Sequence, residues 1–412
     1  MKKKRRKHKR KKNIPPAKKV TVSEIERMGS VKRKHIIAVS AISMISFFAI
    51  LLIFQLMTVF GEKKTFSELE NRTLEKFPKF SAKSYFSGSF ADDLEVYTAD
   101  HFFCRDEFIT MKTYIDMALG KHERSGVYIL KDRLVQRFDE PDDSVVSASI
   151  EGINSFAADN DIPVFVMLAP TSGEIYSDEL PKNAPMASEK EFIDSVYSRL
   201  SDSIGTIDAY TVLNLNRNDY ICYRNDHHWT TKGAYLAYTA AGKKMGYAPV
   251  TMDGYDIEHA AAGFKGTLYS SALYNGIEAD TVDYYHCIGG YDITGEDVTE
   301  AFGSDPVHYD DIYFREYLGK KDKYSSFTGQ NQPMVTITSD SPGGKLLIFK
   351  DSYAHCYVPF LMQHYSEVTM VDLRYIQLDY KELIDVSSYD QVMFLYNALT
   401  FSTDRNLKKL KS

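Results

Sequence analysis

The chain has 412 residues, enough for one large domain or two ordinary ones with a sizeable hydrophobic core. Its hydrophobic (44%) and charged (26%) fractions are those of a globular protein, and its four cysteines match no CxxC or zinc-binding spacing. The net charge of −6 is unevenly distributed: residues 1–34 hold 16 Lys and Arg against two Glu, a balance of +14, which leaves −20 for the remaining chain.

An uncharged apolar run of 25 residues, Ile36 to Phe60, follows the basic tail. A helix crosses the hydrocarbon core with about 20 residues, and flanking basic residues stay on the cytoplasmic side. A cleaved signal peptide fits poorly, because Val59-Phe60-Gly61-Glu62 offers no small-x-small exit site. A buried core helix is the structural alternative. We therefore expect a cytoplasmic tail (1–34), a single transmembrane anchor (35–60) and an extracytoplasmic remainder.

The basic tail has two possible partners. Clusters of Lys and Arg bind nucleic acid, but beside a spanning helix they more simply set topology and attract anionic lipid, so no nucleic-acid partner is expected. The outer compartment permits disulfides, yet buried free thiols are an equal possibility for the four cysteines, Cys104, Cys222, Cys287 and Cys356.

Residues 61–125 are expected to form a juxtamembrane segment that packs on the domain, with a helical stretch over 89–119. The domain proper is expected over 126–412. It begins with a hairpin at 126–136 that turns at Lys131-Asp132.

From there the pattern alternates between helices and buried strands. We expect helices at 147–160, 189–203 and 230–245, a strand at 163–170, and an irregular or β-rich insertion at about 250–340. The C-terminal part predicts strands at 345–350, 367–374 and 391–397 with helices at 353–364 and 381–386 between them. This order indicates an α/β fold with a parallel sheet, whose carboxyl edge carries Ser352, Arg374 and Asn397.

An acid, a base and a hydroxyl nucleophile are present in the order Asp226, His228, Ser352. On an extended segment Asp226 and His228 share one face, so the acid can orient the base while the base faces Ser352; His227 would point the other way, towards packing or a substrate. Free amides at the start of the 353–364 helix could stabilise an oxyanion, with Asn397 as a further donor. Trp229, the only tryptophan, could wall the site or stack on a sugar ring.

Each of these residues also has a structural interpretation. Asp-x-His pairs occur in surface loops, and Asp351-Ser352 could simply cap a helix. Asn397 and Arg374 taken alone are ordinary structural residues. A metal site formed by the ligand types Asp226, His227 and His228 is a rival, but adjacent histidines on an extended chain point apart. Cys356 beside His355 is a weaker nucleophile candidate, because it lies inside the predicted helix.

The motif Asp226-His227-His228-Trp229, with the sequel Thr230-Thr231-Lys232-Gly233, resembles the DHHW protein family. That family is similar to the SGNH-hydrolase-like acetyltransferases that O-acetylate alginate and other exopolysaccharides. Further motifs that carry the resemblance are Glu70-Asn71-Arg72, Leu168-Ala169-Pro170, Gly266-Thr267-Leu268-Tyr269 and Phe349-Lys350-Asp351-Ser352. Lys350 stands where typical SGNH hydrolases carry glycine.

The resemblance implies an SGNH-like three-layer α/β/α sandwich with Asp226, His228 and Ser352 as its triad. It implies a serine-dependent O-acetyltransferase without a cofactor, which modifies a cell-surface polysaccharide and receives acetyl from a multi-pass membrane O-acyltransferase. A carbohydrate esterase with the same triad is the close alternative. A non-enzymatic polysaccharide assembly or binding protein on the same fold is the other.

Overall fold

The computed structural model describes residues 21–297 and 307–411. Residues 1–20 of the predicted basic tail and residues 298–306 of the predicted insertion lie outside this part of the chain. The chain divides into two compact units. The first comprises Met1–Thr65 and Glu75–Arg105, and the second comprises Phe66–Leu74 and Asp106–Ser412.

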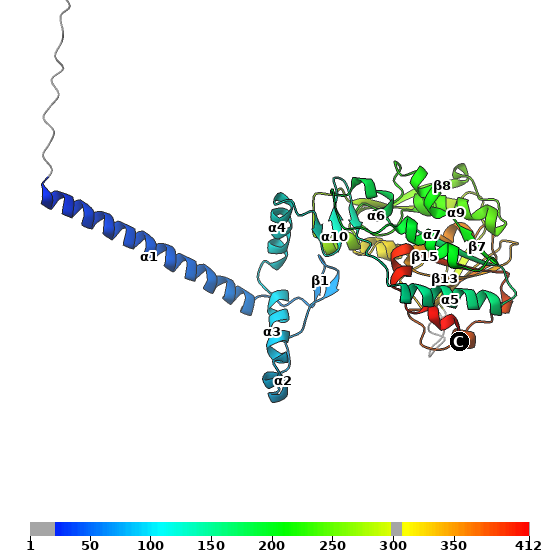
Figure 1. Cartoon of the computed structure of the whole chain (residues 1–412), viewed down its shortest axis with the longest axis horizontal. Helices are drawn as coiled ribbons and strands as arrows, with labels where there is room; N and C mark the ends of the chain where they lie inside the picture. Colours follow the sequence, from blue (N-terminus) through cyan, green and yellow to red (C-terminus); the bar gives the residue numbers. More distant parts are fainter. Residues whose placement is uncertain (1–20, 298–306, 412) are drawn as a thin grey trace, which may run out of the picture. The chain divides into compact units, whose positions relative to one another are not determined.

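The first unit contains the long helix α1 (Val22–Phe60), drawn in blue in Figure 1. Its part Lys32–Phe60 is, among the described residues, the one helix long and apolar enough to cross a membrane, and no residue of its most apolar stretch is buried. This is consistent with the predicted single-pass anchor. The helix begins well before residue 35, so the predicted boundary between tail and anchor lies inside a continuous helix.

Two further helices of the first unit, α2 (Ala82–Ser87) and α3 (Ser89–Asp100), meet at Gly88, whose φ of 86° is left-handed. The predicted helix over 89–119 is wrong as a single element. It is broken into α3 and α4 (Arg105–Ala118) by residues 101–104, where Cys104 has a φ of 58° that no continuous helix accepts.

The second unit is organised around an eight-stranded sheet in the order β11-β10-β12-β14-β13-β15-β6-β7. The strands from β14 to β7 run parallel, and β12, β10 and β11 extend the sheet antiparallel. Their bounds are β6 Val164–Ala169, β7 Ile204–Ile207, β10 Ile293–Asp297, β11 Val307–Tyr309, β12 Met334–Ser339, β13 Lys345–Lys350, β14 Glu367–Val371 and β15 Gln391–Asn397. The predicted α/β fold with a mostly parallel sheet is confirmed.

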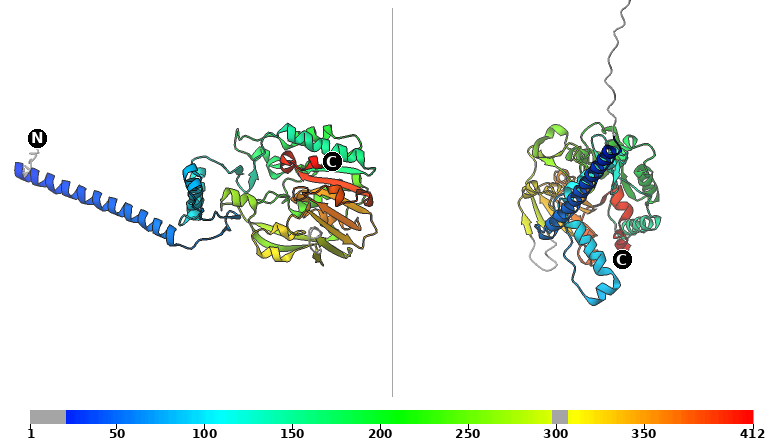
Figure 2. Two further views of the ribbon diagram at one scale, coloured as in Figure 1. Left: turned by 90° about the horizontal axis from the view of Figure 1, so that it is seen from below. Right: turned by 90° about the vertical axis from the view of Figure 1, so that its left-hand side faces the viewer.

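Helices cover both faces of this sheet, as Figure 2 shows. Along β13, Leu346 and Ile348 pack with α9 on one face, whereas Leu347 and Phe349 pack with α5 on the other. The result is the predicted three-layer sandwich. Its helices are α5 Asp143–Asp159, α6 Ser172–Ile175, α7 Glu189–Arg199, α8 Ala209–Leu215, α9 Thr231–Met245, α10 Thr267–Ala272, α11 Val358–Leu361 and α12 Ala398–Thr403.

The predicted helix over 353–364 is wrong. A single 3₁₀ turn, Ser352–Ala354, is followed by the one-turn helix α11, in whose first turn Pro359 lies. Proline has no N–H to donate and is tolerated only at a helix start, so a helix through 353–364 cannot continue past it. The predicted helix at 381–386 is likewise replaced by 3₁₀ turns at Tyr380–Glu382 and Val386–Ser388.

Smaller sheets complete the unit. The predicted hairpin is present as β4 (Val127–Ile129) and β5 (Leu134–Gln136), with β3 (Glu123–Arg124) at its side, and β1 (Phe66–Ser67) pairs with β2 (Arg72–Thr73). Within the insertion, β8 (Tyr255–Phe264) pairs with β9 (Asp280–Cys287), while its later strands join the main sheet. All four cysteines are free thiols.

Candidate active site

The Asp226–Trp229 motif lies on a tight loop. Cys222 and Trp229 form an antiparallel bridge across it, and the amide of Tyr223 donates to the carbonyl of His228 over 3.2 Å. The segment is therefore bent, whereas the sequence analysis expects it to be extended. The bend allows Asp226 Oδ1 to accept from the backbone amide of His228 (3.1 Å) as well as from its ring.

Ser352, His228 and Asp226 form a continuous chain of hydrogen bonds. His228 Nδ1 lies 2.5 Å from Asp226 Oδ1, and His228 Nε2 lies 2.7 Å from Ser352 Oγ. Asp226 and His228 are buried, while Ser352, directly after β13, is half-buried. The structure thus brings together all three residues proposed for the triad, in the geometry of a base between an acid and a hydroxyl.

The second oxygen of Asp226 is fixed by Thr267, the first residue of α10. Thr267 donates both its amide (2.8 Å) and its hydroxyl (3.0 Å) to Asp226 Oδ2. Gly266 makes this approach possible, because a Cβ at that position would stand 2.1 Å from the same oxygen. Burial raises the pKa of Asp226, but the two neighbouring histidines and the hydrogen bonds outweigh it and hold the pKa below its usual range. The carboxylate is therefore ionised.

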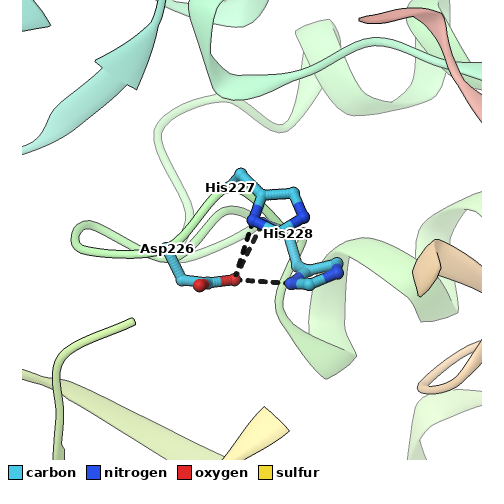
Figure 3. Close-up of side chains that lie close together, drawn as sticks. All are labelled: Asp226, His227 and His228. Carbon is cyan, nitrogen blue, oxygen red and sulfur yellow. Dashed lines mark hydrogen bonds and ion pairs between the residues drawn. The ribbon is translucent and has the colours of Figure 1, made fainter. Parts of the chain in front are cut away.

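The prediction that His227 points away from His228 is wrong. Figure 3 shows both imidazole rings beside the Asp226 carboxylate; their centroids are 3.8 Å apart, and His227 Nδ1 lies 2.6 Å from Thr267 Oγ1. Burial and the neighbouring His228 lower the pKa of His227 to about 4, so its ring is neutral at pH 7.

Tyr324 is a site residue that no pattern in the sequence indicates. It comes from the insertion and lies parallel to the ring of His228, with centroids 3.6 Å apart. Its hydroxyl donates to the carbonyl of Ser352 (3.0 Å) and lies 3.3 Å from Cys356 Sγ. Tyr324 therefore contacts both the imidazole of His228 and the backbone of Ser352.

Trp229 is a packing residue, which corrects the expectation that it could stack on a sugar. It is 1% exposed, its indole N–H donates to the carbonyl of Tyr353 (3.1 Å), and its ring lies against those of Tyr353 and Tyr357. The tryptophan thereby ties the histidine loop to the segment that carries Ser352.

Asn397 is placed at the expected strand end but is not a free oxyanion donor. Its Nδ2 donates to Asp351 Oδ2 (2.6 Å) and to Thr400 Oγ1 (2.8 Å), which uses both amide hydrogens. Asp351 in turn accepts from the amides of Asn397 (2.8 Å) and Tyr353 (2.9 Å). Asp351 and Asn397 therefore join the ends of β13 and β15 beside the serine.

Arg374 lies three residues beyond β14, in a loop rather than at the end of the predicted strand. Its Nε and Nη2 donate to the two oxygens of buried Asp372, over 2.8 and 2.6 Å. Lys350 reaches the same carboxylate at 3.6 Å and also contacts His355 and Asn331. Burial lowers the pKa of Lys350 to about 8. Lys350 and Asp372 thus form a buried charged network that holds Arg374 in place.

A pocket of about 780 Å³ lies at this edge of the sheet. His227, Arg374 and Asn397 line it, together with Thr267, which holds Asp226. Its other walls combine hydroxyl- and amide-bearing residues (Ser125, Gln136, Thr171, Ser271, Thr400, Thr403 and Asn406) with apolar and charged ones (Val127, Leu268, Leu399, Asp404 and Arg405). Asp226, His228 and Ser352 are not among its lining residues. Its polar groups can hydrogen-bond a ligand, and its apolar side chains can pack against one.

The rival chemistries fit this geometry less well. The ligand atoms of Asp226, His227 and His228 do lie within 4.8 Å of one another, as a metal site requires. However, both ring nitrogens of His228 already face Asp226 and Ser352, so binding a metal would break the triad. Cys356 is buried, and burial raises the pKa of its thiol to about 12, which excludes a thiolate nucleophile at neutral pH.

Comparison with known structures finds relatives of the same fold. A DHHW family protein from Eubacterium siraeum is 27% identical, with a TM-score of 0.59 over 70% of this chain and 96% of that one. Bacillus cereus PatB1, solved with a sulfonyl adduct, is 19% identical, with a TM-score of 0.57 over 68% of this chain and 97% of its own. The O-acetyltransferase domain of Pseudomonas putida AlgJ is more distant, at 14% identity and a TM-score of 0.42 over 70% of this chain and 99% of its own. The first two of these structures support the α/β fold of the second unit.

The sequence itself assigns the family. None of the curated proteins matches the chain. The family model described as "DHHW protein" matches residues 118–371, more than half of the sequence, including Asp226, His228 and Ser352. The chain belongs to the DHHW family.

Proposed function

We propose that this protein is a membrane-anchored O-acetyltransferase that moves acetyl through Ser352 onto a hydroxyl of a cell-surface polysaccharide. The hydrogen-bonded chain from Asp226 through His228 to Ser352 carries the proposal. A serine hydroxyl becomes nucleophilic when an oriented base can remove its proton, and the chain supplies that base and its orienting acid.

The chemistry runs in two half-reactions. Ser352 Oγ attacks the acetyl carbonyl carbon of a donor ester while His228 Nε2 takes the serine proton. The tetrahedral intermediate collapses, the donor alcohol leaves with that proton, and acetyl-Ser352 remains. An acceptor hydroxyl then gives its proton to His228 and attacks acetyl-Ser352, which restores the serine. Asp226 stabilises the imidazolium in both steps and holds Nδ1 protonated.

The pocket supports a carbohydrate acceptor. Its hydroxyl and amide groups can hydrogen-bond a sugar, and Arg374, held by Asp372, adds a cation to the lining. PatB1 accepted a sulfonyl group in its structure. Sulfonyl electrophiles react with activated hydroxyl groups, so this chemistry offers a direct probe of Ser352.

The anchor supports an extracytoplasmic location. Basic residues on the N-terminal side of the apolar stretch favour a cytoplasmic N-terminus, and we propose that the second unit lies outside. An acetyl group must then be delivered across the membrane, and a multi-pass membrane O-acyltransferase is the proposed donor partner. Water in place of the acceptor would make the same triad an esterase.

The full-length protein in detergent would be treated with phenylmethylsulfonyl fluoride or a chromogenic acetyl ester and digested for mass spectrometry. We expect the adduct on the peptide that carries Ser352. It should be absent from Ser352→Ala and present in the control Ser402→Ala, which removes a buried hydroxyl that only bonds the carbonyl of Leu399. Labelling that survives in Ser352→Ala would overturn the proposal.

A second measurement separates transferase from esterase. Release of the chromogenic alcohol would be followed with and without added polysaccharide, and the polysaccharide would be analysed for acetyl groups. Acetylated polysaccharide is the expected result. Turnover at the same rate without acceptor, and with free acetate as product, would identify an esterase. Loss of activity on adding a chelator would contradict the serine mechanism.

A further inference from the structure

The first unit carries an unusually exposed set of aromatic side chains between Lys76 and Phe86, here called the aromatic–basic segment. Phe77, Phe80, Tyr85 and Phe86 are exposed, Phe86 by 86% of its surface. No residue of α2 is buried. Large apolar rings gathered in this way are costly in water and mark a surface that meets another phase or partner.

These rings form one group rather than isolated exposures. Phe80 lies 6.0 Å from Tyr85 and 5.4 Å from Phe90 between ring centroids, and Tyr85 lies 5.5 Å from Phe86. Phe77 packs edge-on against Tyr97 of α3 at 5.2 Å. The aromatic–basic segment is therefore held alongside α3.

The end of α3 in turn packs on the anchor helix. The rings of Phe102 and Phe103 lie 6.0 and 5.6 Å from that of Phe54, and the amide of Phe103 donates to Thr58 Oγ1 over 3.1 Å. Phe54 precedes the end of α1 at Phe60 by six residues, about 9 Å along the helix axis. If α1 spans the membrane, Phe102 and Phe103 lie at the level of its outer boundary.

A buried carboxylate ties the aromatic–basic segment to the same level. Asp100 at the end of α3 accepts from the amide of Glu75 over 2.9 Å, so the segment begins where α3 meets the anchor. The ring of His101 also lies 3.1 Å, through Nε2, from the carbonyl of Lys64, just past the anchor. These contacts all lie within the first unit.

The charges identify the surface that would receive these rings. Lys76, Lys79 and Lys83 are exposed and alternate with the aromatic residues. Aromatic rings partition to the headgroup region of a bilayer, where lysine ammonium groups reach anionic phosphates. The exposed acids Asp92, Asp93 and Glu95 of α3 would be repelled by such a surface, which places the contact before Gly88.

We propose that the aromatic–basic segment Lys76–Phe86 lies in the headgroup region of the outer leaflet of the membrane that α1 spans, in contact with anionic lipid. The inference rests on the proposed membrane anchor. It gives the first unit a second membrane contact, so that α1 and α3 leave the bilayer as one fixed body rather than as a helix on a free tether.

Full-length protein in lipid nanodiscs of phosphatidylglycerol and phosphatidylcholine tests this. Phe86→Trp would be introduced, with the emission of native Trp229 subtracted, and quenching by lipids brominated near the headgroup would be measured. Phe48→Trp, in the middle of the anchor, and Leu215→Trp, an exposed position in the second unit, serve as references. We expect a blue-shifted emission from the Phe86→Trp variant and at least twofold stronger quenching than from Leu215→Trp.

The two reference variants distinguish failure of the proposed interfacial contact from failure of the proposed membrane anchor. Quenching of Phe48→Trp by deeply brominated lipid, with none of Phe86→Trp by shallow bromine, would overturn the interfacial contact and leave the anchor standing. Absence of quenching in both would overturn both. A blue-shifted but unquenched Phe86→Trp emission would assign the surface to protein and also overturn the proposal. Replacing Lys76, Lys79 and Lys83 by Gln should reduce the quenching in phosphatidylglycerol discs towards its value in phosphatidylcholine alone.

Discussion

Tyr324 lies flat against the imidazole of His228, with 3.6 Å between ring centroids and 7° between ring planes. The histidine is thus fixed on three sides: Asp226 bonds one nitrogen, Ser352 faces the other, and the tyrosine covers one face of the ring. Burial raises the pKa of Tyr324 well above 10, so the ring that covers His228 stays uncharged.

Removing this stacked ring should impair catalysis. Tyr324→Ala leaves His228 free to rotate and opens a cavity, for which we expect a loss of about 3 kcal/mol in the free energy of unfolding and at least a tenfold fall in kcat. Tyr324→Phe keeps the stacking and loses only the hydroxyl contacts with the Ser352 carbonyl and Cys356 Sγ, so its kcat should stay within about threefold of wild type. Ester hydrolysis and urea unfolding measure both; equal losses in the two variants would contradict a positioning role for the ring.

Replacing the triad acid should remove orientation without removing the loop. Asp226→Asn can still accept hydrogen bonds, but it no longer stabilises the imidazolium and can favour the wrong tautomer of His228. We expect kcat to fall roughly 10³–10⁴-fold while sulfonyl labelling of Ser352 slows in parallel. Unchanged labelling would show that His228 does not depend on Asp226.

A substitution at Gly266, which lies outside the Asp226–Trp229 motif, tests whether activity depends on the position of the Asp226 carboxylate. Gly266→Ala would place a methyl 2.1 Å from Asp226 Oδ2, and because the φ of Gly266 is −87°, the clash rather than backbone strain is the cause. A displacement of about 1 Å at a catalytic group costs on the order of 100-fold in rate. Gly319→Ala is the matched control, since a Cβ there meets no atom within 4 Å. Similar activity of both variants would refute the requirement for close approach.

Glu189 predicts a pH dependence of stability. This fully buried carboxyl accepts from the amide of Thr171 (2.7 Å), and burial raises its pKa to about 7 from 4.5. The folded chain therefore binds a proton that the unfolded chain releases between pH 4.5 and 7. Stability falls as pH rises through that window, by about 3 kcal/mol for this group.

Glu189→Gln should abolish this component. Urea unfolding, followed by the fluorescence of Trp229, would be compared at pH 5 and pH 7 for wild type, Glu189→Gln and the exposed control Glu191→Gln. We expect the wild type and the control to lose stability relative to Glu189→Gln as pH rises. Parallel curves for all three proteins would contradict the raised pKa.

The strands and the nucleophile were predictable because they depend on local pattern. The apolar run Lys345–Lys350 can only be a strand buried on both faces, so Ser352 follows at the carboxyl edge, where β13 and β15 lie side by side. The same reasoning from local pattern failed for the next predicted element, the helix over 353–364. Pro359 cannot lie inside the helix expected over 353–364, and Ser352 is the first residue of a 3₁₀ turn instead.

The remaining parts of the site depend on contacts that pattern does not encode. Tyr324 is 96 residues from His228, in a stretch without helical or strand periodicity, and reaches the imidazole only because the insertion folds back over the sheet. The pairing of Arg374 with Asp372 was equally hidden. The two residues are close in sequence, but no pattern indicates that their side chains bind each other. The bend at Asp226 arises from hydrogen bonds within the loop, which the expectation of an extended strand left out.

The burial of Trp229 changes how the four-letter signature should be used. Asp226 and His228 belong to the proposed triad, His227 lines the pocket, and Trp229 donates a hydrogen bond to the backbone of Tyr353 and so holds the loop in place. A homologue could keep the aromatic letter for folding alone after its histidine or its distant serine had been lost. Positions 228 and 352 should therefore be inspected together when such homologues are sorted into enzymes and inactive scaffolds. A match to the motif alone would count too many homologues as enzymes.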